Sequence, residues 1–351
     1  MYNTTVYDQA GTTTFRRSSS ALCLNWRQEL YCGTNLQNIN KYLRRIYHAR
    51  KGYKLGQVDQ AGAEALIVAF LCNDGNFRSL FLNSVKPHVF VALHIFSEVW
   101  SQKCNEHQLD IKFNIDELLS CPIPSLKRHE RWKELDELIK SSDNWNASER
   151  YYYMAKQICH SCNYGIGPKT FGINVLDKSE GKVVIPTKKA KEYIEFYHAL
   201  FPEIRDWHRE VERQIRETRT LYNLFGYPCY FHGEITPRYL QECFAFIPQS
   251  TVGCITAHAT TRLQEFIEDN NLQWDILADT HDSYLVQAPE NEITDCVKIM
   301  KGFMEQPLTS PRGESFNMRA ECQIGYNWSP CKLDREGNVL DNAEGMREVK
   351  L

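Results

Sequence analysis

Two aspartates that each end a short apolar stretch, Asp59 and Asp282, have the residue type and setting that chemistry on phosphates requires. Asp59 lies in the motif VDQAGAE at residues 58–64, and Asp282 lies in the motif THDS at 280–283. Mg²⁺ prefers oxygen ligands and often takes only one or two protein carboxylates, because phosphate and water complete its shell. Two carboxylates brought together from distant segments would therefore form a minimal site for Mg²⁺ and a triphosphate, as a nucleotidyl transferase needs.

The first motif is predicted to lie where a strand is followed by a helix. Residues 55–59 favour a short strand, Gly62 interrupts it, and the apolar run at 63–72 indicates a buried helix. Asp59 would then lie at the end of the strand. Glu64 would lie in the first helical turn, where the helix dipole favours an acidic side chain.

The second motif is predicted to be the tip of a β-hairpin. Two apolar runs, 274–279 and 283–287, flank the polar residues that carry His281 and Asp282. A helix is expected just before them, over 254–268. A metal-dependent phosphohydrolase of the HD type would instead place this pair in a helix and would need further His and Asp ligands, so the strand setting argues against that class.

A helix between the two motifs carries three side chains suited to an anionic ligand. It is expected over 146–164, because an Asn-x-x-Glu start signal opens it at 146–149 and a Gly- and Pro-rich segment follows it. Lys156, His160 and Tyr164 recur every four residues and therefore share one face. The alternative is an ordinary amphipathic face with a core tyrosine.

The distribution of charge is more informative than its total. At 351 residues the chain is expected to form about two domains, and with 42% hydrophobic and 24% charged residues it can bury a core. The net charge of −3 does not by itself indicate a nucleic-acid partner. Residues 41–54, however, contain six Lys or Arg and no acid, which predicts either a surface for a nucleic-acid backbone or a solvated face.

The cysteines indicate a reducing compartment. There are thirteen, scattered along the chain, and the polar residues that follow Met1 do not resemble a secretory signal. Cys159 and Cys162 form one Cys-x-x-Cys pair without a second pair at zinc-finger spacing, and they lie inside the predicted helix. The longest apolar run, 65–72, is far shorter than the ~18 residues that a membrane span needs. We expect the cytoplasm of a bacterium or of a phage-infected cell.

These motifs belong to an ordered series that resembles the family A DNA polymerases, the bacterial polymerase I type, and phage-encoded members are the most similar. One such motif would be a weak signal, whereas an ordered set over nearly the whole chain is specific. Besides the two aspartate motifs, A and C, the series comprises 14–19 (TFRRSS), 35–39 (NLQNI), 87–88 (PH), 156–165 (motif B, ending in NYG), 248–250 (PQS) and 325–328 (GYNW).

The chain departs from the family pattern at several positions. Lys156 and His160 stand where motif B usually has arginine and lysine, and His160 is a weaker, pH-sensitive cation. Ser283 stands where motif C usually ends in glutamate, so an auxiliary carboxylate is missing but neither aspartate is. Residues 226–229 (GYPC) match the family's arginine-rich loop poorly.

The resemblance implies an α+β polymerase right-hand fold, with an antiparallel palm sheet and a mainly helical fingers subdomain. The palm would consist of residues 1–75, which carry motif A, and 245–351, which carry motif C. The fingers, with motif B, would be the insert at 76–244. Nothing that resembles a thumb or an exonuclease precedes Arg16, so we expect both to be absent from this chain.

The resemblance also assigns roles to residues. Asp59, Asp282 and the main-chain carbonyl of Gln60 would hold two Mg²⁺ ions, with Mn²⁺ as a substitute. Glu64 would be the steric gate that rejects ribonucleotides, and Tyr164 would stack on the incoming nucleotide. The residues expected to bind the dNTP are Glu64, His88, Lys156, His160 and Tyr164. Those expected to contact DNA are Arg16, Gln37, Asn38, Lys41, Arg44, Arg45, Gln249 and His281.

The expected activity is template-directed DNA synthesis, in which a dNTP is joined to a primer 3′-hydroxyl. The expected partners are primer–template DNA and dNTPs, together with a chain that bears a thumb or exonuclease, or a processivity factor, and no membrane. Two alternatives stay open. A single-subunit RNA polymerase can also carry HDS in motif C, but it has a glycine-like opening at Glu64 and lacks NLQNI. A non-catalytic DNA-binding remnant would account for His160, Ser283 and the missing thumb.

Overall fold

The computed structural model divides the chain into two compact units. The first unit comprises residues 1–64, 222–229 and 246–351, and the second comprises 65–221 and 230–245. The residues that the structure describes are 5–8, 12, 14, 18–21, 23–26, 29–32, 37, 39–40, 43–106, 115–146, 149–280, 282–333 and 337–351.

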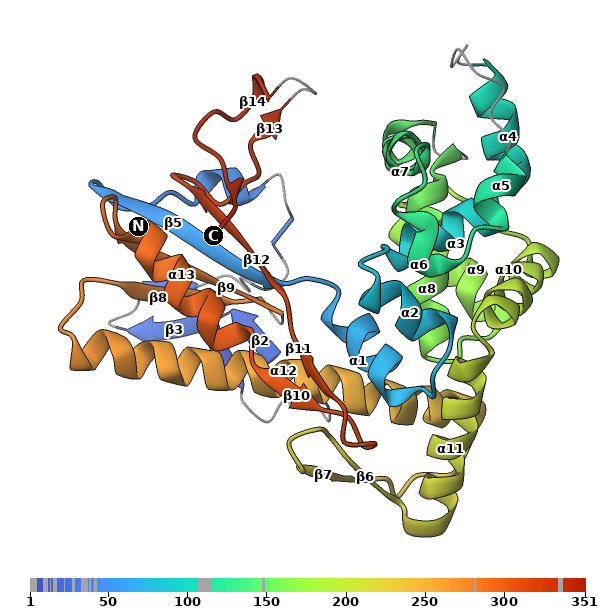
Figure 1. Cartoon of the computed structure of the whole chain (residues 1–351). Helices are drawn as coiled ribbons and strands as arrows, with labels where there is room; N and C mark the ends of the chain where they lie inside the picture. Colours follow the sequence, from blue (N-terminus) through green and yellow to red (C-terminus); the bar gives the residue numbers. More distant parts are fainter. Residues whose placement is uncertain are drawn as a thin grey trace. The chain divides into compact units, whose positions relative to one another are not determined.

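The first unit is built on a five-stranded antiparallel sheet with the strand order β15-β12-β5-β9-β8 (Figure 1). The predicted strand and hairpin are confirmed, because β5 is central and β8 and β9 pair directly. The fold class is also as expected, with an antiparallel sheet in one unit and mainly helices in the other. The strands are β5 (Tyr53–Gln60), β8 (Asp275–Asp279), β9 (Ser283–Pro289), β12 (Ala320–Gly325) and β15 (Arg347–Val349).

Two helices, α12 (Pro237–Asp269) and α13 (Ile293–Met304), supply the apolar side chains that cover one face of this sheet. Val58 on β5 belongs to the same buried cluster as Leu263 on α12 and Val297 on α13. Gly56 lets α13 approach β5 closely, because a Cβ at this position would lie 2.3 Å from Val297 Cγ1. Figure 1 shows α13 lying across the strands.

The opposite face of the sheet has its own smaller core, formed by Leu55, Ala278, Leu285, Trp328 and Met346. Side chains alternate between the two faces along a strand, so β5 directs its even-numbered residues toward the helices and its odd-numbered residues, Asp59 among them, toward this second core. Alternation thus places Asp59 on the face that α12 and α13 leave open.

The predicted start of α12 at residue 254 was wrong, since the helix begins at Pro237 and contains Pro248 in its interior. Proline removes a backbone donor and normally interrupts a helix, which is why the pattern predicted a later start. Pro248 is buried between Ile247 and Gln249 in this helix. Packing of the apolar face therefore outweighs the local cost of the proline.

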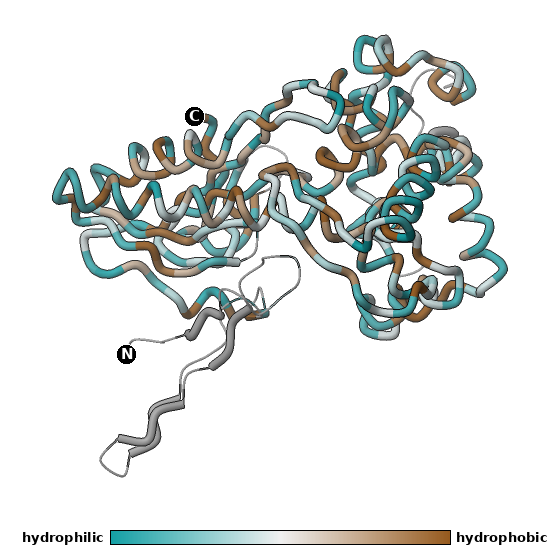
Figure 2. The backbone as a smooth tube through the Cα atoms, turned by 90° about the horizontal axis from the view of Figure 1, so that it is seen from below, coloured by the Kyte–Doolittle hydropathy of each residue, from teal (hydrophilic) through white to brown (hydrophobic). Residues whose placement is uncertain are grey.

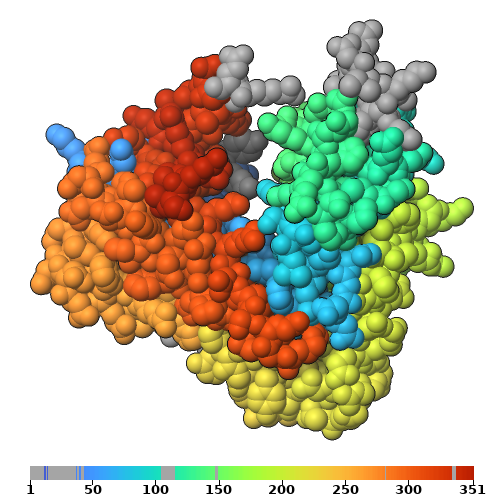
Figure 3. Space-filling model, in the orientation of Figure 1, coloured from blue at the N-terminus to red at the C-terminus, as the bar shows by residue number. Residues whose placement is uncertain are grey.

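Besides the five-stranded sheet, the described residues form separate two-stranded antiparallel pairs, and the C-terminal strand β15 returns to the sheet beside β12. Lys301 Nζ on α13 donates to the main-chain oxygen of Leu351 at 3.1 Å, and Figure 3 shows the dark red C-terminal residues against the orange α13. The short pairs are β1 (Thr5–Asp8) with β2 (Ser18–Ala21), β3 (Cys23–Trp26) with β4 (Glu29–Cys32), β6 (Thr220–Tyr222) with β7 (Pro228–Tyr230), β10 (Pro307–Thr309) with β11 (Ser315–Asn317), and β13 (Lys332–Leu333) with β14 (Val339–Asp341).

The second unit consists mainly of helices with one apolar side, and Figure 2 shows brown apolar stretches alternating with teal polar ones along them. In α11, Ile204, Trp207, Val211 and Ile215 recur every three or four residues and are all buried. The helices are α1 (Ala63–Leu71), α2 (Asn76–Leu82), α3 (Pro87–Ile95), α4 (Ser97–Glu106), α5 (Ile115–Leu119), α6 (Ile123–Leu126), α7 (Trp132–Ser141), α8 (Tyr151–Asn163), α9 (Pro168–Lys178), α10 (Thr187–Leu200) and α11 (Pro202–Thr218).

The start of α8 also differs from the prediction, because the helix begins at Tyr151 and not near residue 146. Asn146 and Glu149 bond to each other through their side chains at 3.4 Å instead of capping the helix. The main-chain N–H of Tyr152 donates to Ser142 Oγ at 3.0 Å, so a residue of the preceding 3-10 turn η3 (Ser142–Asn144) accepts one of the free N–H groups of the first helical turn. Among the described residues, no helix combines the length and apolar character that a bilayer span requires.

Candidate active site

The two acidic motifs meet at one end of the sheet. Asp59 lies opposite Ser283 in the register between β5 and β9, and the main-chain N–H of Gln60 donates to the carbonyl oxygen of Asp282 at 3.0 Å. Both aspartates are half-buried. Segments more than 200 residues apart in the chain are therefore joined directly by backbone hydrogen bonds at the two candidate ligands.

The donor set at this position fits a hard divalent cation. It consists of two carboxylates and the neighbouring main-chain carbonyls, which are the oxygen ligands that Mg²⁺ prefers. In the part of the chain that the structure describes, no group of three or more His, Cys, Asp or Glu side chains gathers as a closed metal cage. Two carboxylates leave most of a cation's coordination positions to water and phosphate, as in sites where Mg²⁺ carries a nucleotide.

A chain of side-chain hydrogen bonds supports the motif C turn from the same face of the sheet. Gln57 Nε2 donates to Ser283 Oγ at 3.1 Å, and Trp328 Nε1 donates to Gln57 Oε1 at 2.9 Å. Thr280 closes the turn, because its main-chain N–H donates to the carbonyl of Ser283 at 2.9 Å. Ser283 therefore holds the loop that carries Asp282. Sequence reasoning noted only the glutamate that Ser283 replaces, and it missed Gln57.

The side chain of Gln60 has a structural role. It is 2% exposed, and its Nε2 donates at 3.0 Å to Thr256 Oγ1 on α12. Tyr284 Oη donates to the main-chain oxygen of Thr256 at 2.6 Å, so strand β9 is attached to the same turn of the helix. This side chain lies on the helix-covered face, opposite Asp59. Only its main-chain carbonyl remains a candidate metal ligand, as the prediction specified.

Glu64 lies in the first turn of α1 and is half-buried, where the sequence pattern placed it. The predicted helix at 63–72 is confirmed, since α1 covers Ala63–Leu71. Four residues therefore separate the candidate metal ligand Asp59 at the end of a strand from an acid at the start of a helix.

A cluster of titratable side chains forms around α8 in the second unit. Lys156 Nζ bonds to Asp143 Oδ2 at 2.8 Å and lies 3.9 Å from the centre of the Tyr152 ring. The ring of His88, near the start of α3, meets Tyr152 edge-on at 6.2 Å. Burial, and then the charge of Lys156, lowers the pKa of His88 to about 4. His88 is therefore neutral near pH 7 and would contribute a hydrogen bond to an anion rather than a charge.

Asp143 is a member of this cluster that sequence reasoning missed. Its Oδ1 is buried and has no hydrogen-bond partner among the described residues, while its Oδ2 holds Lys156. No spacing rule connects residue 143 with residue 156, because the turn between η3 and α8 creates the contact. Tyr152, in contrast, lies four residues before Lys156, and helical spacing could have found it.

The four-residue spacing of Lys156, His160 and Tyr164 is realised at the end of α8. The rings of His160 and Tyr164 meet edge-on with centroids 5.3 Å apart. His160 is exposed, Tyr164 is half-buried, and Tyr164 is the C-cap residue of the helix. A cation, an imidazole and an aromatic ring thus follow one side of the last two turns.

Cys159 and Cys162 lie within the same helix as buried free thiols. Burial raises the pKa of Cys159 well above its usual value and also raises that of Cys162. Both side chains are thus kept in the protonated form, which is a poor nucleophile and a poor metal ligand.

The residues predicted to contact DNA are described only in part. Arg16, Asn38, Lys41 and His281 lie outside the described residues. Gln37 is buried, and Gln249 is half-buried on α12. The guanidinium of Arg44 lies over the Trp328 ring at 4.4 Å, while Arg45 forms an exposed ion pair with Asp341 at 3.1 Å. The basic stripe at 41–54 is therefore not one uniform row of solvated cations.

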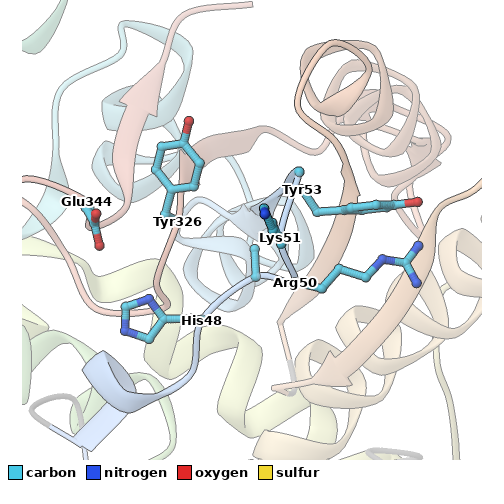
Figure 4. A pocket seen from close by; sticks show the side chains of 8 residues that line it. His48, Arg50, Lys51, Tyr53, Tyr326 and Glu344 are labelled. Atoms are coloured by element: carbon cyan, nitrogen blue, oxygen red, sulfur yellow. The ribbon is translucent and has the colours of Figure 1, made fainter.

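A pocket of about 250 Å³ opens at the other end of β5, where the strand begins. Figure 4 shows His48, Tyr326 and Glu344 on one side and Arg50 and Tyr53 on the other, with Lys51 between them; Ala49 and Gly52 complete the lining. Arg50 is paired with Asp275 at 3.4 Å and lies over the Tyr53 ring at 3.7 Å. The basic residues of the pocket thus have acidic neighbours. The pocket lies at the opposite end of β5 from Asp59.

The sequence of this chain matches a protein-family model and several characterised relatives. The model of DNA polymerase family A matches residues 136–330. DNA polymerase I of Caldicellulosiruptor bescii is 23% identical over 340 residues, which is 93% of this chain and 32% of that protein. DNA polymerase I of Treponema pallidum is 21% identical over 336 residues, which is 92% of this chain and 27% of that protein. The chain thus spans about a third of the length of these relatives.

A solved structure shares the fold. The POL domain of Pol1 from M. smegmatis, determined in complex with DNA primer-template and dNTP, matches with a TM-score of 0.62 and 20% identity. The match covers 92% of this chain and 47% of that one. At this level of identity the likeness establishes the polymerase fold.

Proposed function

Because the chain belongs to DNA polymerase family A, we propose that it catalyses template-directed DNA synthesis by metal-dependent nucleotidyl transfer from a dNTP to a primer 3′-hydroxyl. The observation that carries this proposal is the meeting of Asp59, near the end of β5, with Asp282, the residue directly before the adjacent strand β9. The family resemblance implies that these two carboxylates converge on one sheet, and the β5–β9 register with its bond between Gln60 and Asp282 is the arrangement that this role requires.

The reaction is an in-line attack of the 3′-oxygen on the α-phosphorus of the dNTP. One oxygen–phosphorus bond forms, the bond to the pyrophosphate oxygen breaks, and the hydroxyl proton leaves with solvent. Two divalent ions, when bound, supply the positive charge that this exchange needs. Asp59, Asp282 and the main-chain carbonyl of Gln60 would hold Mg²⁺, or Mn²⁺ as a substitute, with the turn at Ser283 keeping Asp282 in register.

The cluster around α8 would bind the triphosphate. Lys156 brings charge and His88 a neutral ring, and phosphoryl-transfer enzymes act largely through such positioning and charge. His160, the exposed imidazole one turn further along α8, would add a further contact to the phosphates. Asp143 already neutralises part of Lys156, so the arriving triphosphate competes with an internal carboxylate.

Glu64 and Tyr164 would select the sugar and hold the nucleoside. A bulky acid in the first turn of α1 would exclude the 2′-hydroxyl, which is the group that distinguishes a ribonucleotide. Tyr164 would stack on the incoming nucleotide with its ring held edge-on by His160. The basic stripe would contact DNA phosphates, which is independent of sequence, while Gln37 and Gln249 would reach minor-groove edges or sugars at the primer–template end.

The decisive experiment is primer extension by the purified chain. A labelled primer–template is incubated with dNTPs and Mg²⁺, with Mn²⁺, or with a chelator, and parallel reactions receive NTPs. Extension with dNTPs and a divalent ion supports the proposal. Extension only with NTPs would favour an RNA polymerase, and tight primer–template binding without extension at high enzyme would favour a DNA-binding remnant.

A further inference from the structure

The C-terminal end of α8 is closed by main-chain hydrogen bonds. The main-chain N–H of Ile166 donates to the carbonyl of Ser161 at 3.2 Å, and that of Gly165 donates to Cys162 at 3.1 Å. Gly165 has φ +69°, so the two bonds form a Schellman cap that favours glycine at this position. This cap still leaves the carbonyl of Asn163, the last residue of the helix, without a helical donor.

Two side chains from other helices complete the end of α8 by holding Asn163. His208 Nε2 on α11 lies 2.8 Å from the main-chain oxygen of Asn163, and Tyr197 Oη on α10 donates to its Oδ1 at 2.7 Å. Asn163 is 3% exposed and Tyr197 is fully buried. Because both side chains are buried from solvent, the bonds fix the asparagine in one orientation.

His208 is itself held in place. Its ring stacks on Phe244 with centroids 4.2 Å apart and an interplanar angle of 19°. Phe244 in turn packs on Gly165, where a Cβ would lie only 3.0 Å from the Phe244 ring. Burial is the main cause that lowers the pKa of His208 to about 4, so the ring is neutral near pH 7 and its single N–H is the one that reaches Asn163.

We propose that Tyr197 and His208 are positioning residues that act through Asn163 to set the orientation of Tyr164 and His160 toward the incoming nucleotide. Asn163 directly precedes Tyr164, and the Tyr164 ring meets His160 at 5.3 Å, so a rotation of the helix end moves both side chains. The proposal rests on the function proposed above. It assigns nucleotide positioning to two helices, α10 and α11, that carry none of the predicted site residues.

The test uses substitutions that remove one hydrogen bond at a time. Tyr197→Phe deletes only the hydroxyl, His208→Ala removes the imidazole donor, and His208→Gln keeps an amide N–H that can replace it. Tyr193→Phe is the matched control, because Tyr193 lies one turn earlier on α10 and packs on Phe96 at 5.6 Å instead of reaching Asn163.

The primary readout is the ratio of dideoxynucleotide to deoxynucleotide incorporation within one enzyme preparation. A ratio cancels any loss of folded protein, so a merely structural role would not change it. We expect Tyr197→Phe and His208→Ala to change this ratio and to raise KM for dNTP by about tenfold, as the loss of one buried hydrogen bond implies. The kcat at saturating dNTP should stay near that of the wild type, while Tyr193→Phe and His208→Gln should resemble the wild type.

Unchanged ratios and KM in both Tyr197→Phe and folded His208→Ala would overturn the inference while leaving the proposed function intact. If His208→Ala does not fold, Tyr197→Phe alone decides. If the wild type extends no primer, the proposed function fails, and calorimetric titration with Mg·dNTP then judges the inference. Weaker binding by Tyr197→Phe than by Tyr193→Phe would support it, and equal affinities, or no binding by the wild type, would overturn it.

Discussion

Asp59 lies directly opposite Ser283 in the antiparallel register of β5 and β9, one residue from Asp282. Side chains alternate between the two faces of a sheet. A slip of the register by one residue would therefore move every side chain of the shifted strand to the opposite face. The buried side chains of Val58 and Tyr284 and the bond between Gln57 and Ser283 make such a slip costly. The register therefore fixes Asp59 at the end of β5 and holds the turn that carries Asp282 beside it.

Replacing either aspartate should abolish extension without unfolding the protein. Asp59→Asn and Asp282→Asn keep the side-chain volume but remove a ligand charge, and we expect losses of about a thousandfold or more in kcat. The control is Asp275→Asn, a half-exposed acid of β8 that pairs with Arg50. Steady-state primer extension measures the effect. Near-normal activity in either site variant would contradict the metal assignment.

Glu64→Ala should admit ribonucleotides. Removing the bulky acid from the first turn of α1 opens the space under the sugar, and we expect NTP use relative to dNTP use to rise by at least about tenfold. Glu98→Ala, which removes an acid from the first turn of α4, is the matched control. Competition between NTP and dNTP on one template provides the measurement. An unchanged sugar preference would remove the gate role.

Asp143→Asn should tighten dNTP binding. The variant releases Lys156 from its 2.8 Å partner and removes a negative charge that a triphosphate must approach, so KM for dNTP should fall about threefold. Stability should change by less than about 1 kcal/mol, since the pair is partly exposed. Asp136→Asn, which breaks the ion pair with Lys140 on α7, serves as the charge control. A higher KM would show that Asp143 orients Lys156 for catalysis.

Gln57→Ala should destabilise the protein and slow extension together. It leaves Trp328 Nε1 without its acceptor and removes the Gln57 donor to Ser283 Oγ, which keeps its bond to the Thr280 hydroxyl, and this should cost about 1–3 kcal/mol of unfolding free energy. Urea unfolding measures the stability, and Gln264→Ala, an exposed change on α12, is the control. A stable variant with full activity would mean that the network does not hold the motif C turn.

Stability should fall as pH drops, in part because of His198. Burial and the nearby Arg205 lower the pKa of this side chain to about 3 from an ordinary value of 6.5. Between these two pH values the unfolded chain binds a proton at His198 and the folded chain does not. Protonation therefore favours the unfolded chain, and the free energy of unfolding decreases as pH falls below about 6.5. His198→Phe should flatten the dependence of urea midpoints between pH 7 and pH 5, whereas His232→Phe, at an exposed site, should leave it unchanged.

The sequence predicted the elements whose signals are local. The apolar runs around Asp59 and Asp282 predicted β5 and the hairpin of β8 and β9, and Glu64 was correctly expected in the first turn of α1. The fold class and the polymerase family also followed from the ordered motifs. These features depend on alternation and helical spacing, which a reader can count along the chain.

The boundaries that were wrong have non-local causes. Helix α12 passes through Pro248 because its packing against the sheet outweighs one missing bond, and α8 begins at Tyr151, where Ser142 accepts a free N–H of the first turn. A prediction from neighbouring residues includes the proline and the Asn-x-x-Glu signal. It does not include the packing of α12 on the sheet or the hydrogen bond from Tyr152 to Ser142.

By itself the sequence determined which residue types could do the chemistry, since acids and cations at helical or strand spacing are visible in the chain. Only the tertiary structure decided which partners surround them. It paired Lys156 with Asp143, supported Ser283 by Gln57, and held Asn163 between Tyr197 and His208. These contacts join segments that no periodicity relates, because burial and hydrogen bonding are satisfied by neighbours in space rather than in sequence.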